Sequence, residues 1–259
     1  EHYQPRFAGD EVPTTAAGRL VSVADKLDTM AGIFGMGMSP TGSADPYALR
    51  RSAIGILTMI LDGMPLTLDE AIGAALDGYH GVLEDLSANT VGPKIREFFN
   101  GRLDVMLRDQ GFAYDVVDAV MARASDDPAD TWRRVKALAA FRGSDAGADL
   151  AIAFKRAMNL ADPAFASERP QRDLLAQDEE RTLVDALDQA DANVKSLMEE
   201  HDYEGALAEL AHFRAPVDAF FDEVLVMAED ESLRANRMKI LNQLVGLFAD
   251  FADFGRLVG

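Results

Sequence analysis

Residues 132–160, WRRVKALAAFRGSDAGADLAIAFKRAMNL, carry the clearest structural pattern of this chain. Apolar residues recur at helical spacing on both sides of a break at Gly143–Ser144. Gly143 can end the first helix in a left-handed conformation, and Ser144 or Asp145 can cap the second helix. The stretch therefore predicts two helices joined by a short turn.

Leu150, Phe154 and Met158 recur every four residues on the second of these helices. Such a stripe is typical of a helix face that packs against a core, so we expect all three to be buried. The remaining positions hold six cations and an amide, namely Arg133, Arg134, Lys136, Arg142, Lys155, Arg156 and Asn159. They either bind a polyanion or form a solvated basic surface that pairs with the acidic remainder of the chain.

The formal net charge of −19 restricts how nucleic acid could be bound. Residues 161–259 hold 22 acidic and 9 basic side chains, whereas residues 1–160 hold 22 and 16. Nonspecific binding to nucleic acid needs a broad basic surface that displaces counterions. Any nucleic acid must therefore be met by a local basic patch or through contacts to its bases.

The length of 259 residues suits one large or two modest domains. The chain has no cysteine, which excludes disulfides, thiolate metal sites and cysteine nucleophiles. No apolar run approaches the length of a membrane span. Because the sequence starts without a methionine, inside what reads as a motif, we expect it to be a piece of a longer protein.

Helical periodicity continues along the whole chain, and no segment alternates convincingly as a half-buried strand does. We therefore predict an all-α fold with a domain boundary near residues 87–93. The predicted helices cover residues 17–30, a segment opening at Pro46, 67–83, 93–111, 115–124, the two helices around the break, 183–197, 206–213, a segment opening at Pro216, and 233–251. Residues 35–46 and 161–174 are predicted to be irregular.

Two further groups of polar residues are candidate sites. His2 and Asp25 could ligate a metal, but two groups are too few for a metal site. Arg234, Asn236 and Arg237 follow an acidic run at 229–231, an arrangement that complements a helix dipole. Arginine and asparagine on one helix face are also suited to contact base edges.

Four segments carry a family resemblance. They are EHYQPRFAGDEVPTTAAGRLVSVADKLDTMAGIFGMGMSPTGSADPYALRR at residues 1–51, RVKALAAF, AFKRAMNL and PVDAFFDEVLVMAEDESLRANRMKIL. In this order they resemble the β subunit of the bacterial heterotetrameric glycyl-tRNA synthetases. The resemblance implies that residues 1–90 are the latter part of a helical HD-like domain. It implies for residues 91–259 a helical body and a DALR-type anticodon-binding domain, which arginyl-tRNA synthetases share.

The resemblance implies a role in the work of an aminoacyl-tRNA ligase. This chain would be the tRNA-binding, anticodon-recognising part of the β subunit, while a separate α subunit uses ATP and Mg to attach glycine to tRNA(Gly). No catalytic residue, metal or cofactor is then expected in this chain. Its expected partners are tRNA(Gly) and the α subunit in a cytoplasmic tetramer of two α and two β subunits. The candidate tRNA-binding residues are the seven of residues 132–160 together with Arg234, Asn236 and Arg237.

Two other functions compete with this one. In hydrolases of the HD superfamily, the segments that hold His2 and Asp25 here can supply metal ligands, so a fragment of a metal-dependent phosphohydrolase is one alternative. A helical scaffold without any nucleic-acid role is the other. Binding of glycine tRNA in a gel shift separates the first function from both alternatives, and a metal analysis tests the phosphohydrolase.

Overall fold

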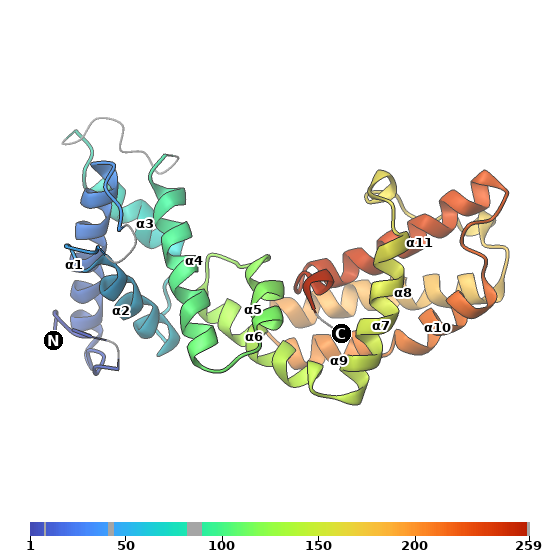
Figure 1. Ribbon diagram of the computed structural model, residues 1–259, viewed down its shortest axis with the longest axis horizontal. Coiled ribbons are helices and arrows are strands. Elements are labelled where there is room, and N and C mark those ends of the chain that lie inside the picture. Colours follow the sequence, from blue (N-terminus) through green and yellow to red (C-terminus); the bar gives the residue numbers. More distant parts are fainter. Residues whose placement is uncertain (8, 41–43, 82–89, 258–259) are drawn as a thin grey trace. The chain divides into compact units, whose positions relative to one another are not determined.

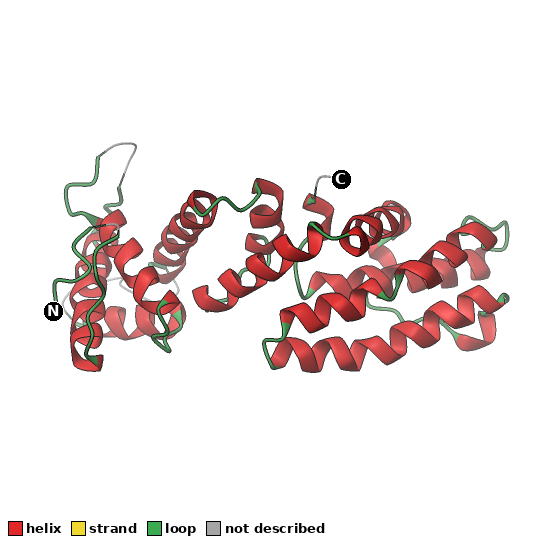
Figure 2. Ribbon diagram, turned by 90° about the horizontal axis from the view of Figure 1, so that it is seen from below, coloured by secondary structure: helices red, strands yellow, loops and turns green. Residues whose placement is uncertain are grey.

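The computed structural model describes residues 1–7, 9–40, 44–81 and 90–257. Within these residues the regular structure consists of α-helices and short 3-10 helices without any strand, so the all-α prediction is confirmed (Figure 2). The described residues form two compact units, and each is considered by itself below. Unit 1 comprises Glu1–Gly111 with Ala124–Trp132, and unit 2 comprises Phe112–Arg123 with Arg133–Gly259.

Unit 1 is a small helical bundle in which α1 packs against α2, α3 and α4 (Figure 1). The bounds of these helices are Ala16–Gly35 for α1, Leu49–Leu61 for α2, Leu68–Asp77 for α3 and Gly92–Asp109 for α4. Their apolar stripes meet in a core that includes Leu27, Met30, Ile56, Ile60, Phe99 and Leu103. Helix α4 packs within unit 1, so this unit continues past residue 90. The boundary between family domains that we expect at residue 90 stays a prediction.

Helix α2 begins three residues after the predicted start at Pro46. The Asp45 carboxylate accepts hydrogen bonds from the backbone N–H groups of Leu49 and Arg50, at 2.8 and 2.9 Å. Ala48, which precedes the helix, has a left-handed backbone with φ 57°. The acid therefore caps α2 across a turn that contains the proline, and a proline-first helix was the wrong prediction. Helix α3 likewise ends at Asp77, earlier than predicted, and Leu83 lies outside the described residues.

Unit 2 contains most of the remaining helices. Their bounds are Tyr114–Met121 for α5, Pro128–Arg142 for α6, Asp145–Leu160 for α7, Asp178–Glu199 for α8, Tyr203–Ala211 for α9, Arg214–Glu223 for α10 and Glu231–Ala249 for α11. Short 3-10 turns lie at Pro163–Phe165 (η1), Arg172–Leu174 (η2) and Phe254–Arg256 (η3). Helices α7 and α8 each contact α9, α10 and α11, and the five helices form a bundle (Figure 1). The first turn of α6 belongs to unit 1.

The break between α6 and α7 lies where the sequence predicts it. The Ser144 Oγ accepts a hydrogen bond from the backbone N–H of Gly147 at 3.1 Å and so caps α7. Gly143 is absent from the residues with positive φ, so the predicted left-handed ending of α6 is wrong. The backbone N–H of Ser144 instead donates to the carbonyl of Phe141 at 2.9 Å. A Cβ at Gly147 would overlap that carbonyl, so this close turn requires a glycine there.

An aromatic cluster fills the core of unit 2 beneath α7. The Phe154 ring lies 4.7 Å from the Phe248 ring and 5.4 Å from the Phe254 ring, centroid to centroid. Leu150 and Phe154 are buried as predicted. Met158 is 37% exposed, so the prediction that it belongs to the core is wrong. The stripe of α7 leaves the core in its last turn, where Met158 meets η3.

Candidate nucleic-acid interface

Helix α6 presents two of its four predicted cations to solvent. Arg133 and Lys136 are exposed, whereas Arg134 and Arg142 are half-buried. The Arg134 guanidinium donates to the carbonyl of Asp250 at 3.0 Å. That link ties α6 to the end of α11, which gives Arg134 a structural role.

Arg142 also has an internal partner. Its Nη1 lies 2.7 Å from Oδ1 of Asp115, a carboxylate that is almost completely buried in α5. An arginine that neutralises a buried acid is held by the fold, because removing it would leave the carboxylate without a counter-charge. Arg133 and Lys136 differ from Arg142 in exposure, since their side chains face solvent.

The three polar residues predicted on α7 are all exposed. Lys155, Arg156 and Asn159 lie within the last two turns of the helix, so one short surface presents two positive charges and one amide. The Arg156 guanidinium lies over the Phe221 ring at 4.5 Å from the centroid, and 3.9 Å from the Asp218 carboxylate. The aromatic contact fixes the direction of the arginine while leaving it accessible.

The face predicted on α11 is largely inside the protein. Asn236 and Arg237 are buried, with exposed fractions of 1% and 5%. The Arg237 Nε lies 2.6 Å from Oε1 of Glu180, and its Nη1 donates to the carbonyl of Leu225 at 2.7 Å. These contacts join α11 to α8 and to the loop before α11, so Arg237 is absent from the surface on which we predicted it.

Asn236 binds backbone rather than solvent. Its Nδ2 donates to the carbonyl of Gln171 at 3.0 Å, and its Oδ1 accepts from the N–H of Gln171 at 2.7 Å.

Arg234 is partly exposed, and its Nη1 donates to the carbonyl of Ala228 at 3.1 Å. The carboxylate of Asp230 caps α11 by accepting from the N–H of Ser232 at 2.8 Å. The helix-dipole interpretation therefore describes the start of α11 better than base reading does.

A pocket of about 360 Å³ opens between α7 and η3 beside the exposed polar residues of α7. Its lining combines the apolar side chains of Ile152, Phe154, Met158, Phe254 and Leu257 with the polar side chains of Lys155, Arg156 and Asn159. Sequence reasoning identified the polar residues but missed the pocket, because η3 lies about a hundred positions further along the chain. A local signal for the pocket is Ile152, an apolar residue that lies off the four-residue stripe of α7 and is exposed.

The weak metal candidates of unit 1 are not brought into a ligand cluster. Within the described ranges, no group of three or more His, Asp or Glu side chains is placed to hold a metal ion. Asp25 instead lines a hollow of about 380 Å³ together with Arg6, Lys26 and Arg51. The lining of this hollow carries three cations and one carboxylate, a charge balance that disfavours a divalent cation. Burial lowers the pKa of the Lys26 amine, which donates to the Ser22 hydroxyl at 2.6 Å.

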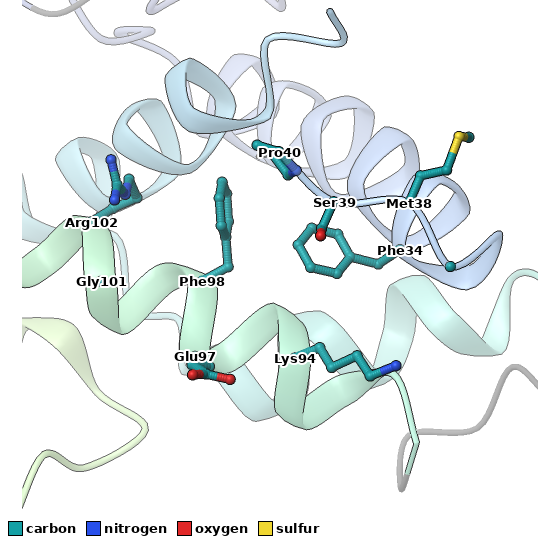
Figure 3. A pocket seen from close by; sticks show the side chains of 10 residues that line it. Phe34, Met38, Ser39, Pro40, Lys94, Glu97, Phe98, Gly101 and Arg102 are labelled. Carbon is teal, nitrogen blue, oxygen red and sulfur yellow. The ribbon is translucent and has the colours of Figure 1, made fainter. Parts of the chain in front are cut away.

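A second hollow in unit 1, of about 530 Å³, holds none of the predicted residues. Figure 3 shows the Phe34 and Phe98 side chains extending into it from α1 and α4, with Ser39 and Pro40 opposite α4. The two rings meet edge to face with centroids 5.5 Å apart. The Phe98 ring is half-exposed at this hollow.

Two family models match the chain. Residues 1–122 match the model described as "Glycyl-tRNA synthetase beta subunit", and residues 151–250 match the "DALR anticodon binding domain". The second match covers most of α7, including Lys155, Arg156 and Asn159, and continues to the end of α11. Arg133 and Lys136 on α6 lie outside both matches. Among the described helices, none is long and apolar enough to cross a membrane.

Curated relatives agree with these matches. The "Glycine--tRNA ligase beta subunit" of Desulforamulus reducens is 46% identical over 260 residues, and that of Syntrophus aciditrophicus is 42% identical over 262 residues. The protein of the same name in Acinetobacter baylyi is 43% identical over 261 residues. Each alignment covers 100% of this chain but only 37–38% of the relative. The chain therefore spans little more than a third of the length of these relatives.

Proposed function

Since this chain belongs to the glycyl-tRNA synthetase beta subunit family, we propose that it is the part of such a subunit that binds tRNA(Gly) and recognises its anticodon. The observation that carries this proposal is the exposed group Lys155, Arg156 and Asn159 on α7, inside the segment that matches an anticodon-binding domain. We use the name basic patch for these three residues together with Arg133 and Lys136, a set defined by exposure on two successive helices. The patch lies in a chain whose net charge is −19.

The physical chemistry of anticodon recognition fits the basic patch. Anticodon bases are unstacked, so side chains can reach their edges while lysine and arginine hold the phosphates. Asparagine offers both a donor and an acceptor to a base edge. The residues after the patch, 161–259, carry 22 acidic and 9 basic side chains. Their negative charge repels RNA elsewhere and so favours one docking position.

The catalytic chemistry belongs to a partner in this proposal. A separate α subunit binds ATP and Mg and joins glycine to the tRNA, and two α subunits assemble with two β subunits in the cytoplasm. The present chain contributes binding energy and anticodon discrimination to that reaction, and no residue of it takes part in the chemical step.

Changing Arg133, Lys136 and Lys155 together to alanine should weaken binding of tRNA(Gly) by the complete synthetase. Each lost phosphate contact removes about 0.7 from the slope of log affinity against log salt, so the slope should fall by about 2. At about 0.1 M salt the affinity should fall on the order of 100-fold. Filter binding at several salt concentrations measures both quantities.

A pair of single variants provides the control. Lys155→Ala should lower the salt slope, whereas Lys195→Ala, which removes an exposed cation of α8 outside the patch, should leave it unchanged. If the folded triple variant keeps both the affinity and the salt slope of the wild-type enzyme, the anticodon site is not on α6 and α7.

The chain without its partner should not activate glycine. The family resemblance assigns ATP and glycine to the α subunit, and the sequence of this chain contains no phosphate-binding loop. We expect glycine-dependent exchange between ATP and pyrophosphate to stay at background for the isolated chain and to rise when the α subunit is added. Exchange by the isolated chain would contradict this division of labour.

A further inference from the structure

The pocket between α7 and η3 has the features of a binding site for a single base. We propose that it holds one unstacked base of the anticodon loop and so fixes the identity of that base. The inference rests on the proposed function, because it names the part of the tRNA that one site takes. It goes further because it assigns one base contact to an apolar pocket, whereas the proposed function requires only exposed charged and polar side chains.

The walls of the pocket are apolar and partly open to solvent. Ile152 is 63% exposed at its edge, and the buried rings of Phe154 and Phe254 lie at its floor. Its volume of about 360 Å³ falls within the roughly 300–1,000 Å³ of small-molecule sites. Bases that leave their stack are held between aromatic or apolar side chains, and cations beside such a site hold the backbone.

Met158 forms part of the pocket wall next to η3. Its thioether lies so close to Gly255 that a Cβ at that glycine would be 2.7 Å from the methionine Cε and 3.1 Å from Sδ. The absence of a side chain at Gly255 leaves room for the methionine beside the backbone of η3. The polarisable sulfur then lies in the lining of the pocket, where it makes favourable contacts with an aromatic ring.

Polar side chains line the pocket beside its apolar ones. Lys155, Arg156 and Asn159 come from the same two turns of α7 as Ile152. A base in the pocket would leave its flanking phosphates next to the two cations, and the Asn159 amide could read its edge. The Arg156 guanidinium is already oriented by the Phe221 ring at 4.5 Å, so little is lost in ordering it.

This combination favours RNA over an apolar protein segment. A protein segment would gain from the apolar wall but would have no use for two cations and an amide on one side of it. A nucleotide uses all three features, because its ring is planar and polar at the edge and its backbone is anionic. The pocket therefore suits a base that is turned out of its stack.

The test measures the affinity of the complete synthetase for four forms of tRNA(Gly), one intact and one abasic at each of the three anticodon positions. The variant is Ile152→Ala, and the control is Leu225→Ala, which shortens a similarly exposed apolar side chain that is not part of the pocket lining. Both truncated side chains are exposed, so both variants should fold, and circular dichroism verifies this.

We expect Ile152→Ala to weaken binding of intact tRNA roughly 10-fold, as loss of a base-stacking contact does. On the tRNA that is abasic at one particular position, the variant and the wild type should bind equally, because the contact is already absent. Leu225→Ala should bind all four forms like the wild type. Asn159→Ala should reduce discrimination between bases at that same position.

Two results would overturn the assignment. An Ile152→Ala defect of the same size on all four tRNAs would mean that the pocket touches something other than an anticodon base. An unchanged affinity would mean that the pocket is not used. In either case, the salt slope of the triple variant of the basic patch decides separately whether the proposed function itself stands.

Discussion

Arg237→Met should lower the free energy of unfolding by about 3–5 kcal/mol, because it leaves a buried carboxylate without its counter-charge. The Glu180 side chain is almost completely buried, and the Arg237 Nε lies 2.6 Å from its Oε1. A carboxylate so deeply buried is poorly hydrated once the guanidinium is gone. Urea denaturation of the chain, followed by circular dichroism, measures the change.

A double variant separates the lost charge from the lost packing. Glu180→Leu with Arg237→Met replaces the ion pair by apolar side chains, and such replacements are often neutral or stabilising. The double variant should therefore recover part of the stability that the single variant loses. Recovery should be incomplete, since the second oxygen of Glu180 accepts from the N–H of Gln177 at 2.8 Å in the capping box of α8. A single variant within about 0.5 kcal/mol of wild type would contradict the structural role.

The same variant distinguishes a structural arginine from an RNA-binding one. Arg237→Met should reduce stability but leave the tRNA affinity of the folded protein unchanged. Lys155→Ala should do the reverse, because Lys155 is exposed on α7. The two arrangements look alike in sequence, where each is a cation on a polar helix position, and only burial tells them apart.

The sequence misplaces the polar face of α11 for a physical reason. Polar residues on a helix are expected to face water, but residues 161–177 cover this face. Asn236 binds Gln171 in that segment, the Lys239 Nζ lies 2.7 Å from Glu168, and Asn242 donates to the carbonyl of Asp162 at 2.9 Å. An irregular segment has backbone groups that need partners, and the polar side chains of α11 supply them.

Local signals account for what could be predicted. The break between α6 and α7 follows from Ser144, whose hydroxyl caps the second helix as its residue type predicts. Thr67 caps α3 in the same way by accepting from the N–H of Glu70. Burial of Leu150 and Phe154 follows from their four-residue spacing. Each of these features depends on residues that are neighbours in sequence, so helical periodicity and capping rules suffice.

The pocket depends instead on a contact between distant segments. Met158 continues the apolar stripe of α7, so spacing alone assigns it to the core. The chain returns at η3 with a glycine against this methionine, and the core ends there. No local rule indicates where a terminal turn will pack, which is why the polar residues of α7 were identified and the pocket beside them was not.

Phe154→Ala should also lower the free energy of unfolding by about 3–5 kcal/mol, the usual loss when a buried phenylalanine is truncated. Its side chain is 5% exposed, and its ring forms a three-ring cluster with those of Phe248 and Phe254. The cavity would open in the middle of the aromatic cluster that joins α7, α11 and η3, where rigid rings cannot collapse to fill it. Urea denaturation of the purified chain measures this loss.

Ile152→Ala is the matched control on the same helix, because its side chain is 63% exposed. Its effect on stability should be within about 0.5 kcal/mol, as for most surface substitutions. Phe154 forms the floor of the pocket, whereas Ile152 forms its edge. Comparing the two alanine variants therefore distinguishes a residue that supports the pocket from one that contacts a base. Phe154→Ala should lose both stability and tRNA affinity, and Ile152→Ala should lose affinity alone. A Phe154→Ala chain as stable as wild type would mean that this aromatic cluster does not hold α7 in place.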